Sequence, residues 1–175
     1  MSKFARVLNL REGEARPLGV MAAFLLLNTA NTTVISAAKN GLFLSEYAGE
    51  LIPYAIIAAA MLTAVVAIVF AGVISGTGRR TLAVGLTVVL GASLIASRIS
   101  FEVDPRSAFL LYLWLSAVQV LIVTHSWNYV AAMLTGRQAK RLLPLIGMGA
   151  SVGAIIGGAS VAPAAYRLGT SNLLV

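Results

Sequence analysis

The stretch TGRQAKRLLPLIGMGAS, Thr135 to Ser151, places three cations within five positions at the start of a long uncharged segment. These cations are Arg137, Lys140 and Arg141, and the next charged residue is Arg167. A basic cluster beside an apolar run is typical of either a nucleic-acid patch or the edge of a membrane-spanning helix. The rest of the sequence distinguishes these two interpretations.

The composition excludes an ordinary soluble domain. Of the 175 residues, 59% are hydrophobic and 11% are charged, whereas a soluble domain carries roughly 25% charged residues. A membrane-spanning helix needs about 20 mostly apolar residues. Five stretches without Asp, Glu, Lys or Arg reach about this length: residues 17–38, 51–78, 81–97, 107–136 and 142–166. They predict an all-α, polytopic helical membrane protein, because a bilayer offers backbone amides no water to bond.

We expect five complete transmembrane helices and the start of a sixth. Residues 1–16 form an interfacial N-terminal segment, and residues 17–175 form a transmembrane helical domain. The predicted spans are residues 18–38, 51–74, 82–97, 109–134 and 143–162, with a sixth beginning at about residue 172. The first span is expected to end at Lys39-Asn40. The fifth is expected to start at Pro144 and end at Pro163, because proline suits a first turn and interrupts a helix interior.

Charge is distributed unequally between the two sides of these spans. The side of the N-terminus holds nine cations and two acids, at Lys3, Arg6, Arg11, Arg16, Arg79, Arg80, Arg137, Lys140, Arg141, Glu12 and Glu14. The other side holds four cations and four acids, at Lys39, Arg98, Arg106, Arg167, Glu46, Glu50, Glu102 and Asp104. The positive-inside rule therefore predicts a cytoplasmic N-terminus. The cations of the two loops on this side are separately expected to form a cytoplasmic gate or anchor: Arg79, Arg80, Arg137, Lys140 and Arg141.

The expected partner of this basic side is the lipid bilayer. Nucleic acid is not expected as a partner, because no aromatic residues that could stack on bases interleave with the cations.

The first span is unusually polar for a membrane helix. Asn28, Thr32 and Lys39 are spaced i, i+4 and i+11, so they share one stripe of a helix, and Asn31 lies close by. Polar groups in a span face the interior of a bundle or a water-filled cavity. Hydrogen bonds between helices and the wall of a substrate cavity remain alternative interpretations, and snorkelling to the interface remains a third for Lys39.

The fifth span carries a stripe of glycines. Gly149, Gly153 and Gly157 are spaced by four and make two overlapping GxxxG steps. Small residues on one face allow a second helix to approach closely. The stripe therefore predicts a helix-packing face on an interior helix.

Three stretches resemble a known family. AKRLLPLIGM, Ala139 to Met148, resembles the signature after the fourth span of the ATP/ADP translocase family, which transports nucleotides. ISAAKNGLFLSEYAGELIPY, Ile35 to Tyr54, resembles the family's passage from the first span to the second. NLREGE, Asn9 to Glu14, resembles the segment before the first span in relatives from free-living bacteria. The resemblance covers nearly all of the chain.

The resemblance implies a major-facilitator-like fold of twelve spans in a bacterial inner membrane, of which this chain corresponds to one half. It implies exchange of ATP for ADP or uptake of other nucleotides, with Lys39 at the position of the family's first-span lysine as a phosphate contact. The sequence departs from the family where Asn40 replaces an Asp, and where the fourth span lacks an acidic residue and offers Gln119 instead. The expected substrate-lining residues are Lys39, Asn40, Asn28, Asn31, Thr32 and Gln119.

Two functions of different classes remain open. The first is a transporter half that acts as a nucleotide antiporter together with a missing C-terminal half. The second is a non-transporting structural or accessory subunit of a larger membrane complex, suggested by the short length, the lost acids and the glycine face. An enzyme is not expected, because the sequence has no nucleophile–base pair and no Walker glycine loop. No cofactor or metal is expected, because the chain has no cysteine and one histidine.

Overall fold

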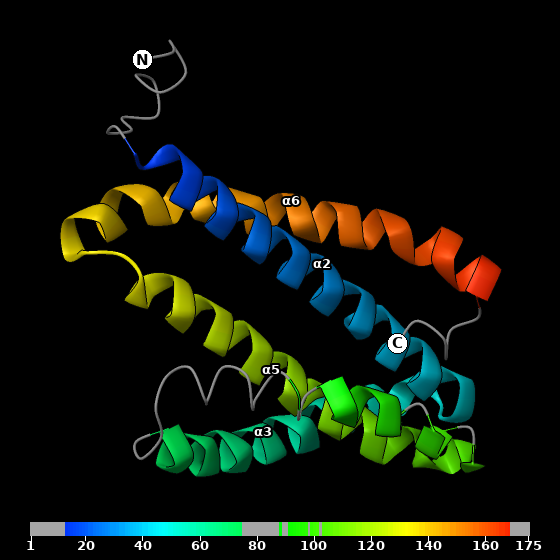
Figure 1. Ribbon diagram of the computed structural model, residues 1–175. Helices are drawn as coiled ribbons and strands as arrows, with labels where there is room; N and C mark the ends of the chain where they lie inside the picture. The colour runs from blue at the N-terminus through cyan, green and yellow to red at the C-terminus, as the bar shows by residue number, and fades with distance from the viewer. Residues whose placement is uncertain (1–12, 75–87, 89–90, 98, 102, 169–175) are drawn as a thin grey trace. The chain divides into compact units, whose positions relative to one another are not determined.

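The computed structural model describes residues 13–74, 88, 91–97, 99–101 and 103–168, and the regular elements in these ranges are all helical. Along the chain they are α2 (Ala15–Glu46), η1 (Gly49–Leu51), α3 (Ile52–Ile74), η2 (Pro105–Ser107), α5 (Ala108–Ala132) and α6 (Gly136–Leu168), where η denotes a short 3-10 helix (Figure 1). The described residues contain no strand, so the predicted all-α class is confirmed for this part of the chain.

Four helical segments are long and apolar enough to cross a membrane. They are Ala15–Glu46, Gly49–Val69, Ala108–Ala132 and Gly136–Arg167. Their lengths and composition are consistent with the predicted helical membrane protein. The number of five spans stays a prediction, because half of the predicted third span and the beginning of the predicted sixth near residue 172 lie outside the described residues. Of the third span, Val88 and residues 91–97 are described and are helical.

The first helix is longer than predicted at both ends. α2 continues past Lys39 and Asn40 to Glu46, so the expected end at this polar pair is wrong. The helix persists because the Lys39 ammonium has a hydrogen-bond partner on α5 and because Leu42 and Phe43 in the next turn are buried. At 1.5 Å per residue the helix is about 48 Å long, which exceeds a hydrocarbon core of about 30 Å.

The last helix begins before the residue that was expected to start it. The backbone N–H of Thr135 donates to Gln138 Oε1 at 3.1 Å, and the backbone N–H of Gln138 donates to Thr135 Oγ1 at 3.4 Å. This reciprocal pair is a capping box, which satisfies two N–H groups that a helix start leaves unbonded. α6 therefore begins at Gly136, and the expectation that Pro144 begins the span is wrong.

Two prolines lie inside α6 without ending it. Pro144 is flanked by Leu142 and Ile146, which are buried in one apolar cluster with residues of α2 and α5. Pro163 is followed by Ala164 and Ala165, which pack against a second cluster that contains Ile35. Each proline removes one backbone N–H donor, and contacts with neighbouring helices stabilise such interruptions in membrane helices. The expectation that Pro163 ends the helix is wrong, because packing outweighs the proline penalty.

Contacts divide the chain into two units, and α2, α5 and α6 contribute to both. The first unit comprises residues 1–33 and 123–159, and the second comprises residues 34–122 and 160–175.

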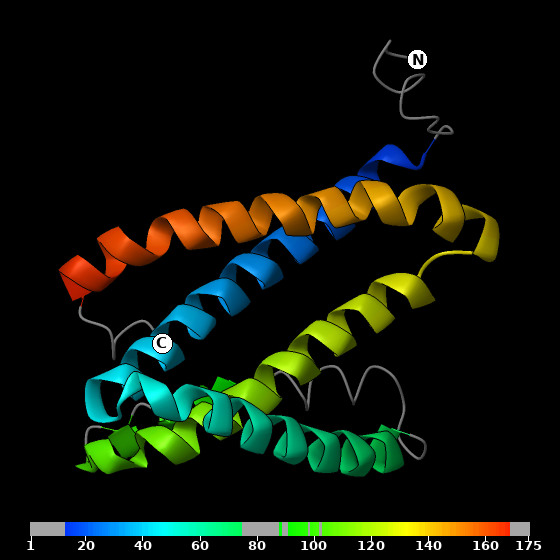
Figure 2. The same cartoon turned by 180° about the vertical axis from the view of Figure 1, so that it is seen from behind.

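The first unit is organised by a close parallel contact between α2 and α6. The N-terminal parts of the two helices lie together in both ribbon views (Figures 1 and 2). A Cβ atom added at Gly149, Gly153 or Gly157 would lie less than 3.0 Å from the backbone of Ala22, Leu26 or Ala30, respectively. Both series advance by four residues in the same direction, so the helices run parallel here. Beside this contact, the buried core consists of Leu25, Val130, Leu142 and Ile146.

The second unit is organised by an aromatic cluster. Phe43 of α2 is fully buried and lies 5.1 Å from Tyr112 of α5 and 5.2 Å from Tyr47, measured between ring centroids. Ala55 and Ala59 of α3 complete the buried cluster. The Tyr47 hydroxyl also donates to the Arg106 carbonyl at 2.9 Å. Rings in such tilted and stacked contacts stabilise beyond their buried area, so this cluster fixes α2 against α5 one turn from Lys39.

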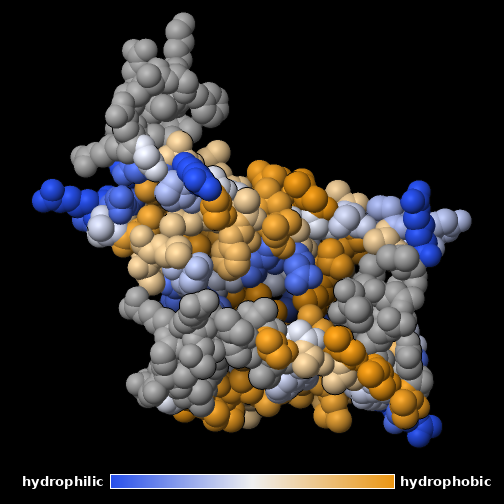
Figure 3. Space-filling view, in the orientation of Figure 1, coloured by the Kyte–Doolittle hydropathy of each residue, from blue (hydrophilic) through white to orange (hydrophobic). Residues whose placement is uncertain are grey.

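Much of the exposed surface is apolar. On α3 the exposed large side chains include Ile57, Met61, Val65 and Ile68, each more than half exposed. Apolar residues predominate where α3 lies in the space-filling view (Figure 3). Side chains of this kind would be unfavourable in water over so large an area. This surface is consistent with contact between the helices and a lipid bilayer.

Candidate functional site

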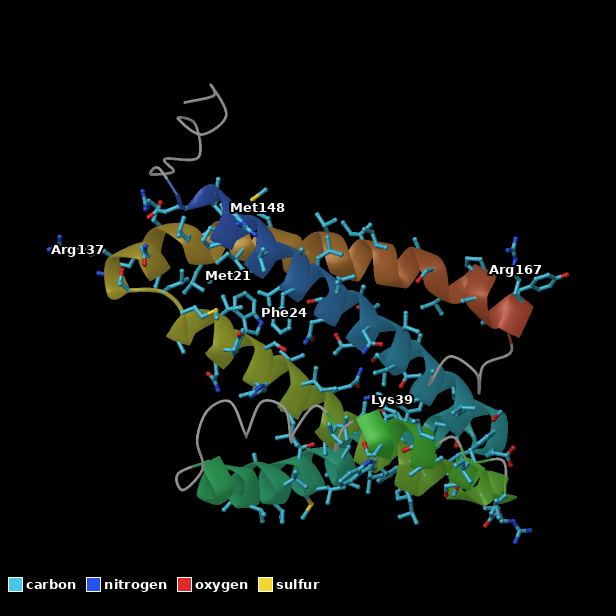
Figure 4. The ribbon with its side chains drawn as sticks, in the orientation of Figure 1. Met21, Phe24, Lys39, Arg137, Met148 and Arg167 are labelled. Carbon is cyan, nitrogen blue, oxygen red and sulfur yellow. The ribbon has the colours of Figure 1, made fainter. Side chains whose placement is uncertain are left out.

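Lys39 lies on α2, and α5 supplies its nearest polar partner. Lys39 Nζ donates a hydrogen bond to Ser116 Oγ at 2.8 Å and lies 5.0 Å from the centroid of the Tyr112 ring. Ser116 in turn donates to the Tyr112 carbonyl at 2.6 Å. The Ser116 hydroxyl hydrogen is therefore directed at α5 itself, and its lone pair is left to accept from the ammonium. In Figure 4, Lys39 lies in the C-terminal part of α2 and Met21 lies in its N-terminal part.

The aromatic cluster lies directly beneath this ammonium. Tyr112 is 5% exposed and packs against Phe43 in a tilted contact, and Lys39 Nζ lies 5.0 Å from the centroid of its ring. A cation near an aromatic ring gains roughly 0.5–2 kcal/mol, depending on desolvation. The contact with Tyr112 thus restricts the position of the flexible Lys39 side chain.

The charge of Lys39 has no acidic counterpart in the described ranges. No Asp or Glu described by the structure lies within ion-pairing distance of Lys39 Nζ. A protonated lysine has three N–H donors, and Ser116 accepts from one of them. The described residues provide no hydrogen-bond acceptor for the other two donors.

The other two expected site residues of the second unit are placed differently. Asn40 follows Lys39 but is exposed, on another side of α2. Gln119 is half-buried and lies three residues after Ser116, so the two share one face of α5. The structure therefore puts Gln119 on the Lys39-facing side of α5 and does not put Asn40 with it.

Asn28, Asn31 and Thr32 belong to the first unit. Asn28 Nδ2 donates to Ser126 Oγ of α5 in a short hydrogen bond, whereas Thr32 Oγ1 donates to the Thr29 carbonyl at 3.0 Å. Asn31 is exposed. Asn28 thus makes the interhelical bond that was one of the alternatives for this stripe, a contact worth about 0.6 kcal/mol on average in membranes.

The basic cluster that begins α6 is partly neutralised. Arg141 Nη2 lies 2.6 Å and 2.5 Å from the two carboxylate oxygens of Glu14, and Gln138 Nε2 approaches Glu14 at 3.4 Å. The side chains of Arg141 and Glu14 are 22% and 12% exposed. This ion pair joins the start of α2 to the start of α6 in the first unit, so Arg141 has a structural partner.

The remaining cations of the expected gate or anchor differ from Arg141. Arg137 and Lys140 are exposed, and neither has a hydrogen bond or ion pair with any part of the chain that the structure describes. Arg137 points away from the helices in Figure 4. Arg79 and Arg80 lie outside the described residues.

Sequence reasoning missed four residues of these networks: Ser116, Tyr112, Ser126 and Glu14. A partial signal existed for two of them, because Tyr112, Ser116 and Gln119 are spaced i, i+4 and i+7 and mark one polar face of an otherwise apolar helix. Glu14 was counted as a charge on one side of the membrane, without a partner.

These side chains offer one positive charge and several hydrogen-bonding groups. Within the described ranges no three His, Asp or Glu side chains come close enough together to hold a metal ion. Comparison with protein-family models, curated proteins and solved structures found no match to this chain. The contacts described above define the candidate site as Lys39, which Ser116 and Tyr112 hold in place, with Gln119 on the same side of α5.

Proposed function

We propose that this chain is a transporter-like membrane protein that holds an anionic substrate through Lys39. Nucleotides such as ATP and ADP are the substrates that the family resemblance implies, and phosphate oxygens are suitable acceptors for a lysine ammonium. The observation that carries the proposal is a half-buried, oriented cation without a described carboxylate partner, on a helix that is long and apolar enough to cross a membrane.

The physical argument concerns the cost of an isolated charge. Ionisable groups within membrane helices are costly and face a partner, a cavity or a pathway. Ser116 and Tyr112 orient the Lys39 ammonium, but neither carries an opposite charge. An anionic substrate would supply that charge, and binding would then be strongest for the ligand that best completes the coordination of the ammonium.

The first test is ligand-dependent thermal stabilisation of the protein. The midpoint of unfolding would be measured in detergent with ADP, ATP and inorganic phosphate as separate probes. We expect at least one of them to raise the midpoint in the unsubstituted protein, and we expect Lys39→Ala to abolish this increase. Binding of a ligand to the native state alone stabilises that state by mass action.

Lys140→Ala is the matched control. Lys140 is also a lysine, but it is exposed on α6 and has no described partner, so its loss should leave the ligand-dependent increase unchanged. An equal increase in Lys39→Ala and in the unsubstituted protein would remove Lys39 from the site. The absence of any increase with all three probes would contradict the proposed anion binding.

The alternative function is a non-transporting accessory subunit. The glycine face does not favour it, because Gly149, Gly153 and Gly157 pack against α2 within the same chain and are not left for another protein. Native mass spectrometry of gently solubilised membranes distinguishes the two functions. Stable association with other membrane subunits, without a nucleotide response, would favour the accessory role.

A further inference from the structure

A pocket of about 370 Å³ lies at the end of the first unit where α2 and α6 begin. Its apolar lining comes from α2, from the turn after α5 and from α6: Pro17, Leu18, Met21, Met133, Leu134 and Leu142. Its remaining walls are Gly13, Glu14 and Gln138. The volume is within the range of roughly 300–1,000 Å³ that ligand pockets have. The proposed anion site on Lys39 shares none of these residues.

The walls of this pocket suit an apolar chain with a polar end. Met21 and Met133 contribute flexible, polarisable side chains that adapt to ligands of irregular shape. The carboxylate of Glu14 does not present an uncompensated charge to the pocket, because Arg141 binds both of its oxygens. Glu14 and Gln138 therefore form a polar but largely neutralised edge to an otherwise apolar lining.

The position of the pocket indicates where its ligand comes from. α2, α5 and α6 are each long and apolar enough to cross a membrane, and the pocket lies where α2 and α6 begin and α5 has just ended. In a bilayer, the ends of spanning helices lie where acyl chains give way to headgroups. The ligand with the most direct access to this place is a membrane lipid.

Basic residues around the pocket favour a lipid with an anionic headgroup. Arg16, Arg137 and Lys140 are exposed, and none of them has a hydrogen bond or ion pair within the described residues. Arg16 adjoins the lining residue Pro17, and Arg137 adjoins the lining residue Gln138. Basic side chains near a membrane surface attract anionic headgroups through their field, and direct contact with each phosphate is not required.

We propose that this pocket binds an acyl chain of one anionic phospholipid, whose headgroup lies in the field of Arg16, Arg137 and Lys140. The acyl chain would lie between the beginnings of α2 and α6, next to the Glu14–Arg141 ion pair.

The test is native mass spectrometry of the full chain after incubation with equal amounts of phosphatidylglycerol and phosphatidylcholine. We expect one retained lipid, with phosphatidylglycerol favoured about tenfold or more by the three cations. Met21→Trp should fill the pocket and remove the retained lipid of either kind. Met133→Trp is a second filling variant, at a side chain that is 54% exposed, so a folding defect in one variant does not decide the result.

Two further variants separate the pocket from the surface. Met148→Trp is the matched control, because Met148 is 62% exposed and does not line the pocket; it should retain the lipid. The double variant Arg137→Gln/Lys140→Gln should retain a lipid but lose most of the preference for phosphatidylglycerol.

Several outcomes would overturn the proposal. Equal retention of lipid by Met21→Trp, Met133→Trp and the unsubstituted protein would show that the lipid binds elsewhere on the surface. Equal binding of the two lipids by the unsubstituted protein would contradict the anionic class. Retention of no lipid by the unsubstituted protein would contradict lipid binding in the pocket.

Discussion

At the scale of single residues, the hydroxyl of Ser116 decides where the Lys39 ammonium lies. If Lys39 binds an anion as proposed, Ser116→Ala removes a hydrogen bond to a charged group, which is worth roughly 1.5–3 kcal/mol, and lets the lysine sample other rotamers. We expect the apparent affinity for the nucleotide probe that stabilises the protein to fall about tenfold for each 1.4 kcal/mol lost. The measurement is a titration of the unfolding midpoint with that probe.

Ser116→Thr is the control for this prediction, because threonine retains the hydroxyl at the same position. We expect it to restore most of the affinity that Ser116→Ala loses. If both variants bind the probe as the unsubstituted protein does, Ser116 does not position Lys39 for binding.

The sequence singled out Lys39 but not the residues that orient it, and the reason is physical. A serine in an apolar helix can satisfy itself by donating to the carbonyl four residues earlier, as Ser116 does to Tyr112. Nothing in the spacing along one helix tells which side of α5 meets α2. Asn28 illustrates the same limit, since its polarity predicted a partner but only the tertiary contact identifies Ser126.

At the scale of helices, the parallel contact of α2 and α6 depends on the absence of a side chain at Gly153. A Cβ atom there would lie 2.8 Å from the Leu26 carbonyl carbon and 2.9 Å from Leu26 Cα. Backbone atoms cannot move aside as a flexible side chain can, so Gly153→Ala must separate the helices. We expect it to lower the free energy of unfolding in mixed micelles by about 1–3 kcal/mol, the usual cost of overpacking.

Gly158→Ala is the matched control on the same helix, because no described atom outside α6 lies within 4 Å of the Cβ position at Gly158. Because alanine has a higher helix propensity than glycine, Gly158→Ala should leave the free energy of unfolding unchanged or raise it by up to about 1 kcal/mol. Equal effects of the two substitutions would mean that α2 and α6 do not pack closely at Gly153.

The helices themselves were largely predictable, and their ends were not. α3 and α5 nearly coincide with the predicted spans 51–74 and 109–134, because long uncharged runs leave no alternative to a helix in a bilayer. The ends of α6 were misjudged because its prolines were given more weight than the Thr135–Gln138 capping box. The Thr-x-x-Gln pattern was present in the sequence, whereas the packing that stabilises the helix around Pro163 was not.

At the scale of the whole molecule, the remaining question is which side of the membrane each helix end occupies. The parallel contact requires α2 and α6 to begin on the same side, and this requires an odd number of crossings between them, in agreement with the three predicted spans 51–74, 82–97 and 109–134. α6 has 33 residues and is therefore about 50 Å long, long enough for its two ends to emerge on opposite sides. The excess of cations at the start of both helices predicts that this side is the cytoplasm.

Single-cysteine labelling tests this orientation, because the chain has no cysteine of its own. Arg137→Cys and Tyr166→Cys place one thiol near each end of α6, and both positions are exposed. In intact cells, a membrane-impermeant maleimide should label Tyr166→Cys, and it should label Arg137→Cys only after the membrane is permeabilised. The opposite pattern would reverse the predicted orientation, and labelling of both thiols in intact cells would show that α6 does not cross the membrane.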